Sequence, residues 1–344
     1  MRLAFYRPKS RGDRSSPEAV TIVVCARNEA QNLEKNLGSL LEQEYPVFEL
    51  IVVDDASTDR TKEILETYQI KYSKLKVVQL KNKQSAGKKA ALIAGIQAAQ
   101  YDWLLLTDAD CRANSKHWIQ KMQARVEQKT DVVLGYGPYL KGTGWINIWV
   151  RFETLYTAVQ YFSFALWGVP YMGVGRNLMY RKTLWKKRRK AIKGNHLASG
   201  DDDLWINQMA NAENTKICID AEAFMYSEPK RRFSSVYRQK ARHYSTSNYY
   251  QLKHQLALGL LALSHFACYV LAFFLLICAN GFHYIFLLLM GLRLLLVYVV
   301  WHGLAGRLDG RDLLKYLWAL DLFVPIYYLL FLPSLILTKK MTWK

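Results

Sequence analysis

Two aspartates one residue apart, Asp108 and Asp110, directly follow an apolar run at residues 104–107. A short run of this kind is typical of a strand buried on both faces of a parallel sheet. In open α/β sheets, ligands bind at the carboxyl ends of strands, which is where these acids would lie. Paired carboxylates are suitable ligands for Mg²⁺ or Mn²⁺, ions that often also contact substrate phosphates. The alternative is a solvated loop that happens to contain two acids.

The surrounding sequence alternates between buried-strand and helical patterns. Strands are predicted at residues 20–25, 50–53, 77–80 and 104–107, and helices at 33–41, 61–68, 86–99 and 118–127. This alternation indicates an α/β fold with a mostly parallel sheet and right-handed crossovers. Three of the strands run into acidic or amide residues, so their loops should meet at one edge of the sheet. The glycine motifs of dehydrogenases and P-loop proteins are missing from the sequence, which disfavours both classes.

A second acidic cluster, Asp201-Asp202-Asp203, precedes the apolar residue Leu204. Acids at the start of a helix interact favourably with its dipole, and a helix is expected from here. Three neighbouring carboxylates also repel one another, which a bound cation or a proton-accepting role would justify. The two interpretations are compatible.

The net charge of +19 comes largely from basic clusters at residues 181–193 and 230–253. Such clusters suit phosphorylated substrates, anionic lipid headgroups or nucleic acid. Because apolar segments follow them, lipid and phosphate are favoured and no nucleic acid partner is expected. The five cysteines include no CxxC pair, which argues against zinc or a disulfide framework and for a reducing compartment.

The last 90 residues are typical of a membrane protein. Residues 256–279 and 284–301 are long and apolar enough to span a bilayer, whereas the third candidate, 316–337, contains Asp321 and two prolines. Basic residues flank the first two spans on one side only. The positive-inside rule therefore predicts a multi-pass protein of the inner or plasma membrane with a cytoplasmic catalytic domain.

Three regions follow from these patterns: a flexible basic tail at residues 1–19, a catalytic domain at 20–250, and a membrane region at 255–338 with two or three transmembrane helices. Within the domain, residues 145–167 are rich in aromatic side chains. They predict either a core helix or a helix at the membrane interface, where Trp and Tyr are favoured.

Six segments occur in a recognisable order. They are VTIVVCARNEA at residues 20–30, IVVDDASTDRT at 51–61, AGKKAALIAGI at 86–96, TDAD at 107–110, GDDDLW at 200–205 and QKARHY at 239–244. Together they resemble the motifs of the membrane-bound members of glycosyltransferase family 2, which share the GT-A fold. The chain departs from the family pattern at Gly200, where an acid is usual, and at His243, where Trp normally stacks near the acceptor sugar.

The resemblance implies roles for particular residues. Those matching nucleotide-sugar-binding positions are Ala26, Arg27, Glu29, Asp54, Asp55, Lys88, Asp108, Gln239 and Arg242. Asp108 and Asp110 match the acids around the diphosphate and the metal, Mg²⁺ or Mn²⁺. Asp201 matches the general base, and Asp202 takes that role if the register shifts by one residue.

The resemblance also implies an activity: inverting transfer of a sugar from a nucleotide-diphosphate sugar, with UDP favoured, to a membrane lipid or polysaccharide. Asp201 would take the proton of the acceptor hydroxyl in a single displacement. Transfer of single sugars to a lipid is favoured over processive polymer synthesis, because the spans are few and His243 replaces Trp. A nucleotidyltransferase, which would want a glycine-rich loop after the first strand, and an inactive nucleotide-sugar binder are the alternatives.

Overall fold

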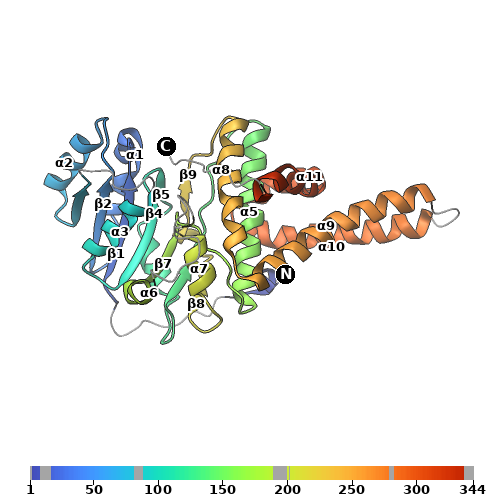
Figure 1. Cartoon of the computed structure of the whole chain (residues 1–344), viewed down its shortest axis with the longest axis horizontal. Coiled ribbons are helices and arrows are strands. Elements are labelled where there is room, and N and C mark those ends of the chain that lie inside the picture. The colour runs from blue at the N-terminus through green and yellow to red at the C-terminus, as the bar shows by residue number, and fades with distance from the viewer. Residues whose placement is uncertain are drawn as a thin grey trace.

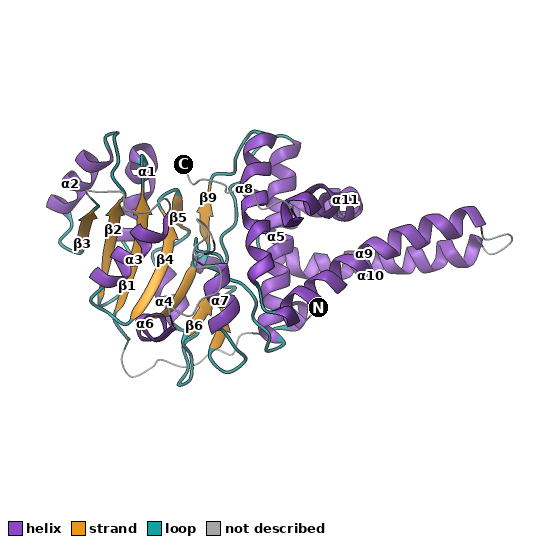
Figure 2. Ribbon diagram, viewed as in Figure 1, coloured by secondary structure: helices purple, strands orange, loops and turns teal. Residues whose placement is uncertain are grey.

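The computed structural model describes residues 2–7, 17–80, 88–188, 200, 202–278 and 283–336. Its centre is a seven-stranded sheet with the order β3-β2-β1-β4-β7-β6-β8. Figure 2 shows β3, β2, β1 and β4 of this sheet side by side. The strands are β1 (Val20–Ala26), β2 (Phe48–Asp54), β3 (Leu75–Gln79), β4 (Trp103–Asp108), β6 (Val132–Leu134), β7 (Leu178–Arg181) and β8 (Thr215–Ile217). Only β7 runs antiparallel to its neighbours, β4 and β6, so the predicted mostly parallel α/β sheet is confirmed.

Strands β1 and β2 are buried along their whole length, which explains their nearly unbroken apolar sequences. Alternate side chains of β1 enter two different cores: Ile22 and Val24 lie on one face of the sheet, and Val23 lies on the other. The helices that connect or cover the strands are α1 (Ala30–Leu41), α2 (Thr61–Lys71), α3 (Lys88–Ala98), α4 (Trp118–Gln123), α6 (Lys182–Arg188) and α7 (Asp203–Met209).

Helix α3 lies unusually close to the sheet at Gly95. A Cβ atom there would approach Val23 Cγ1 to 2.6 Å and Val53 Cγ2 to 3.0 Å. The glycine in the segment AGKKAALIAGI therefore serves helix–sheet packing. The first residues of the helix predicted at 86–99 lie outside the described residues. Helix α4 is shorter than the predicted 118–127, because the chain turns at Ala124 and buries Val126.

The second half of the domain was less apparent in the sequence. Strands β6, β7 and β8 are three or four residues long, and a separate two-stranded sheet pairs β5 (Cys111–Ala113) with β9 (Met225–Ser227). Strands this short leave too few residues for a period-two pattern to be recognised. Short 3₁₀ segments, η3 (Ala221–Ala223) and η4 (Ser247–Tyr249), complete the domain.

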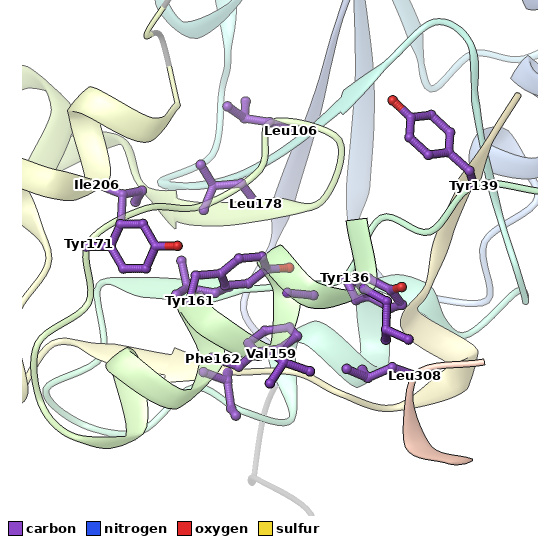
Figure 3. Packing of buried hydrophobic residues seen from close by; sticks show 14 of the residues in the cluster. Leu106, Tyr136, Tyr139, Val159, Tyr161, Phe162, Tyr171, Leu178, Ile206 and Leu308 are labelled. Carbon is purple, nitrogen blue, oxygen red and sulfur yellow. The ribbon is translucent and has the colours of Figure 1, made fainter. Parts of the chain in front are cut away.

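Helix α5 (Trp145–Leu166) stands beside α8 (Phe233–Thr246) between the sheet and the C-terminal helices (Figure 1). Phe162 and Val159 of α5 pack under the sheet, and the hydroxyl of Tyr161 donates to the Gly135 carbonyl at 2.7 Å (Figure 3). Most of this aromatic helix is thus core, and only its ends, Trp145 and Trp167, are largely exposed.

Three C-terminal helices are long and apolar enough to cross a membrane. Helices α9 (Leu252–Cys278) and α10 (His283–Arg307) form a hairpin that reaches away from the sheet, whereas α11 (Leu317–Ile336) stays against α5 and α8 (Figure 1). Asp321 of α11 is buried and bonded to Arg293 of α10, at 2.9 Å, and to Tyr269 of α9, at 2.6 Å. These bonds explain an acid in the third apolar segment.

Both ends of the hairpin are fastened to the domain. At the start of α9, the Gln251 backbone N–H donates to Asn207 Oδ1 of α7 at 2.8 Å. After α10, the 3₁₀ segment η5 (Arg311–Tyr316) presents Asp312 to the buried Arg151 of α5 in a two-bond pair at 2.6 and 2.8 Å. The hairpin therefore leaves the domain and returns to it.

The tail predicted at residues 1–19 is packed where the structure describes its first residues. Arg2–Phe5 form the 3₁₀ segment η1, and Leu3 is buried. The Arg307 guanidinium of α10 donates to the Leu3 carbonyl at 3.3 Å. Residues 2–7 are thus held by the domain and by α10, in contrast to the loose tail that their polar sequence suggested. Residues 8–16 lie outside the described residues.

Candidate active site

The loops after β1 and β2 meet at one edge of the sheet, as their sequences predicted. The register aligns Ala26 with Asp54, and the Asp55 N–H donates to the Ala26 carbonyl at 2.9 Å. Asp54 accepts from the Ser57 N–H at 3.0 Å, which fixes the loop. Arg27 lies 3.9 Å from Asp55, and their facing atoms, Nη1 and Oδ2, have no hydrogen bond within the described parts of the chain.

The next loop along this edge carries the two aspartates after β4. Asp108 pairs with Lys88, the first described residue of α3. Burial alone would raise the pKa of Asp108, but Lys88, Arg176 and Arg242 together lower it. The same surroundings raise the pKa of Asp110, because it is buried and lies beside the negative Asp108.

A divalent cation fits this pair of acids. Oxygen atoms of Asp108 and Asp110 and the Cys111 sulfur lie within 4.8 Å of one another. Burial and the two acids raise the pKa of the Cys111 thiol well above its ordinary value, and Mg²⁺ and Mn²⁺ prefer oxygen to sulfur ligands. The carboxylates therefore remain as ligands, and a cation there would relieve the repulsion that raises the pKa of Asp110.

Glu29, which follows β1, belongs to the same electrostatic group. Its pKa is raised by burial and by the negative charges of Asp110 and Asp108, although a hydrogen bond from Asn32 opposes the shift. The loop that the sequence assigned to the nucleotide therefore lies close enough to interact with the acidic pair.

The second acidic cluster lies across from the first. Asp202 is the N-cap of α7 and accepts from the Asp203 N–H at 2.9 Å and from the Gly175 N–H. A Cβ at Gly175 would lie 2.9 Å from Asp202 Oδ2, so this approach requires glycine. Asp201, which the motif assigns as the base, lies outside the described residues.

Asp203 has a different setting from its neighbours. It is buried and accepts hydrogen bonds from the hydroxyls of Thr246 and Tyr250, the latter at 2.8 Å. Burial, followed by the charge of Asp202, raises the pKa of Asp203 to about 7. Asp203 therefore links the start of α7 to the end of α8.

Helix α8 carries the last of the predicted site residues, Gln239 and Arg242. Gln239 Nε2 donates to the Tyr139 hydroxyl at 3.3 Å, and Arg242 lies close enough to Asp108 to lower its pKa. His243, which stands where the family has Trp, faces the cavity, and its pKa is lowered to about 3 by loss of water and by Lys240 and Arg242. A neutral imidazole thus stands at the position where the family has the indole ring of Trp.

The acids after β4, the acids at the start of α7 and the polar residues of α8 border one cavity of about 570 Å³. Of the predicted site residues, those in its wall are Lys88, Asp108, Asp110, Asp202, Gln239 and Arg242. The predicted residues Ala26, Arg27, Glu29, Asp54 and Asp55 form the adjoining edge of the sheet. The structure thus brings together the acids of β4, the acid at the start of α7 and the basic motif of α8.

Arg176 also lines this cavity, although it lies in none of the six sequence motifs. Its guanidinium stacks on the Tyr139 ring at 4.3 Å and donates to Ser227 Oγ at 2.9 Å. The negative charges of Asp110 and Asp108 contribute to raising its pKa, against the effect of burial. The only signal in the sequence is the glycine-rich segment around it, since Gly137 and Gly175 let the backbone approach Arg176 and Asp202 closely.

Comparison with known proteins agrees with this arrangement. Residues 21–189 match the family model "Glycosyl transferase family 2". Glycosyltransferase AglE of Haloferax volcanii is 28% identical over 201 residues, which are 56% of this chain and 62% of that protein. The poly-beta-1,6-N-acetyl-D-glucosamine synthase of Staphylococcus epidermidis is 34% identical over 93 residues, 27% of this chain and 22% of the synthase. The chain thus spans less than two thirds of these relatives.

The fold has a counterpart among solved structures. The mannosyltransferase PcManGT of Pyrobaculum calidifontis, solved with GDP-Man and Mn²⁺, superposes with a TM-score of 0.56 at 17% identity, covering 95% of this chain and 92% of the other. At this identity the likeness concerns the fold alone, and it confirms the predicted GT-A domain. The matching motifs, the sheet and the family model over residues 21–189 agree with one another, and together they support a family 2 glycosyltransferase with the GT-A fold.

Proposed function

We propose that this protein transfers a sugar from a nucleoside-diphosphate sugar to a membrane-associated acceptor, with inversion at the anomeric carbon. The observation that carries the proposal is the single cavity bordered by Asp108, Asp110, Arg242 and Asp202, with α9 and α11 forming its far wall. Metal-ligating acids, phosphate-binding cations and an acid suited to proton transfer are the groups that this reaction needs. UDP is favoured as the nucleotide by the family resemblance.

The donor is proposed to lie along the sheet edge. Arg27 and Asp55, whose facing atoms lack hydrogen bonds within the described chain, would contact the base and ribose, next to Asp54 and Ala26. Lys88, Arg176 and Arg242 would face the diphosphate. An Mg²⁺ or Mn²⁺ ion held by Asp110 and Asp108 would supply positive charge that stabilises the departing diphosphate. Glu29 would approach the same acids from the first loop.

The acceptor hydroxyl is proposed to attack from the α7 side. Its O–H bond breaks and the proton passes to a carboxylate of the second acidic cluster. The oxygen bonds to the anomeric carbon as the bond from that carbon to the diphosphate oxygen breaks. Attack opposite to the leaving group inverts the anomeric configuration. The motif assigns the base to Asp201, and Asp202, in the cavity wall, is the alternative.

Nucleotide release by the detergent-purified protein tests the proposal. UDP-, GDP- and dTDP-sugars would each be supplied with Mn²⁺, Mg²⁺ or a chelator, together with membrane lipid extract. One donor should support metal-dependent release. Asp110→Asn should lower it on the order of 10²-fold or more, since it removes a charge-stabilising ligand.

The variants Asp201→Asn and Asp202→Asn identify the base. The one that removes the base should reduce the rate about 10²- to 10⁴-fold while donor binding is kept. Glu213→Gln, at an exposed carboxylate outside the cavity, is the matched control. Donor binding without release under every condition would instead support an inactive binder, and no donor binding would refute the proposed function.

A further inference from the structure

The cavity does not end at the reacting groups. It continues between three helices, each of which turns one face toward it. These faces are Trp149, Phe152, Glu153 and Tyr156 on α5, Leu258, Gly259 and Ala262 on α9, and Val324, Tyr327 and Tyr328 on α11. The spacing is that of residues on one side of a helix. Two of the three helices are candidate membrane spans, so this lobe of the cavity adjoins the region where lipid chains would lie.

The wall that α9 contributes to the cavity has open space at one residue, Gly259. A Cβ at Gly259 would meet nothing within 4 Å, and the neighbouring apolar residues of this helix are largely exposed. Gly291 of α10 is equally free of neighbours but does not border the cavity. The α9 face around Gly259 therefore provides both space and an apolar surface beside the cavity.

The inner end of the same lobe is polar. Glu153 of α5 pairs with Lys240 of α8, and their side chains are only 9% and 14% exposed. Thr154 is buried, and its hydroxyl has no hydrogen-bond partner in the described chain. The same holds for Nε of Arg242. Buried polar groups without partners are costly, so these atoms point to a polar ligand that would satisfy them.

We propose that this lobe is the binding site of the acceptor, and that the acceptor is a single-chain amphiphile. Its polar head would lie at Thr154, Lys240 and Arg242, and its apolar chain would pass the Gly259 face between α9 and α11. The small neutral ring of His243, in place of an indole, leaves room for the head. This inference rests on the proposed function and specifies its acceptor.

A lipid photoprobe tests the site without knowledge of the natural acceptor. Two long-chain probes, each with a diazirine and an alkyne and ending in either a hydroxyl or a phosphate, would be incorporated into phosphatidylcholine vesicles with the full-length protein. Irradiation and peptide mapping should place the label on α9 and α11 near Gly259. The probe that labels the protein more strongly identifies which head group, hydroxyl or phosphate, the polar end of the lobe prefers.

Substitutions with a matched control identify the path of the chain. Gly259→Leu should reduce labelling at least 10-fold, Ala262→Leu should also reduce it, and Gly291→Leu should leave it unchanged. Thr154→Val should weaken labelling by the preferred probe about 5-fold without moving the labelled residues. Equal labelling of the Gly259→Leu and Gly291→Leu variants would overturn the inference, as would a label confined to the outer face of the hairpin.

Nucleotide release from the donor in the absence of any lipid separates the two proposals. If the Gly291→Leu control keeps normal release and normal labelling while Gly259→Leu loses labelling, the acceptor site is supported. If the unmodified protein neither binds nor turns over any donor, the proposed function fails, while the labelling result still decides whether an amphiphile enters this lobe.

Discussion

Arg176 illustrates how a single residue in this site depends on its neighbours. The Tyr139 ring and Ser227 Oγ hold its guanidinium, which interacts with Asp110 and Asp108. Such a fixed planar cation suits phosphate oxygens better than a lysine does. We therefore propose that it binds the diphosphate of the donor, although no motif in the sequence marked it.

Arg176→Gln should raise the KM for the donor about 10- to 100-fold, because a hydrogen bond to a charged group contributes about 1.5–3 kcal/mol. Arg176→Lys should recover only part of the loss, since the bidentate geometry is not restored. Steady-state nucleotide release measures both variants. Arg112→Gln, at an exposed arginine of β5, serves as the control and should behave as the unmodified protein does.

We predict that Asp203 makes the stability of the folded protein depend on pH. Its pKa of about 7 in the folded protein lies above the ordinary value of about 3.9. The folded state therefore holds the proton more tightly, and the stabilisation is fully present below about pH 4. It is lost as the pH rises through 7, which lowers the free energy of unfolding by on the order of 4 kcal/mol.

Asp203→Asn cannot ionise and should flatten this dependence. Thermal unfolding of the detergent-purified protein between pH 4.5 and 8 measures the effect. Glu213→Gln should keep the slope of the unmodified protein, as its carboxylate is exposed. An unchanged slope in Asp203→Asn would show that other groups cause the dependence.

The predicted and observed sites differ for reasons that particular residues make clear. Asp108, Asp110 and Arg242 lie in short motifs with fixed spacing, so the sequence was enough to single them out. Arg176, just before β7, and Thr154 of α5 become relevant only because the fold brings them to the cavity from distant parts of the chain. The role of Asp203 likewise depends on its burial. A sequence of three adjacent aspartates does not reveal which of them the fold buries.

The three C-terminal helices are joined by a cluster of polar side chains that lies within their apolar segments. Asp321 of α11 is shared by Arg293 of α10 and by Tyr269 and His265 of α9. Charged residues inside membrane segments are costly unless paired. The pairing explains why α11 carries an acid, a point that could not be decided from the hydropathy of residues 316–337 alone.

Arg293→Leu and Asp321→Leu should each lower the thermal midpoint in detergent, since breaking a buried pair costs about 3–5 kcal/mol. The double variant Arg293→Leu/Asp321→Leu should lose much less than the sum, because neither charge is left unpaired. Leu292→Ala, an exposed residue on the adjacent position of α10, controls for substitution in this helix. Additive losses would show that the two residues act independently.

Sequence periodicity predicted the elements of the first half of the domain better than those of the second. Strands β1 and β2 are long and doubly buried, and their apolar runs were apparent in the sequence. Strands β6, β7 and β8 are short, and their register is set by pairing with one another and with β4. Pairing of this kind is a tertiary property and leaves little trace in local composition.

The chain as a whole is an α/β domain joined to an apolar hairpin whose two ends both contact that domain. This arrangement predicts that the far end of the hairpin, where α10 begins, lies across the membrane from the catalytic domain. Ile70 is 90% exposed on the domain and Tyr284 is 67% exposed at the start of α10. Cysteines introduced at these two positions should label from opposite sides.

The measurement uses a membrane-impermeant maleimide on sealed, oriented vesicles, with all five native cysteines replaced. If the catalytic domain is cytoplasmic, as the basic flanks predict, Ile70→Cys should label only in inside-out vesicles and Tyr284→Cys only in right-side-out ones. Labelling of both positions from the same side would show that the hairpin does not cross the bilayer.

The fastening of both ends of the hairpin has one more consequence. Asn207 holds the start of α9, and Arg151 and Leu3 hold the segments at the end of α10. A domain attached at both ends of the hairpin is expected not to swing on a single hinge. If the hairpin crosses the bilayer, the acids of the cavity would be held at one height above it, and we predict that an acceptor is glycosylated only if its hydroxyl reaches that height.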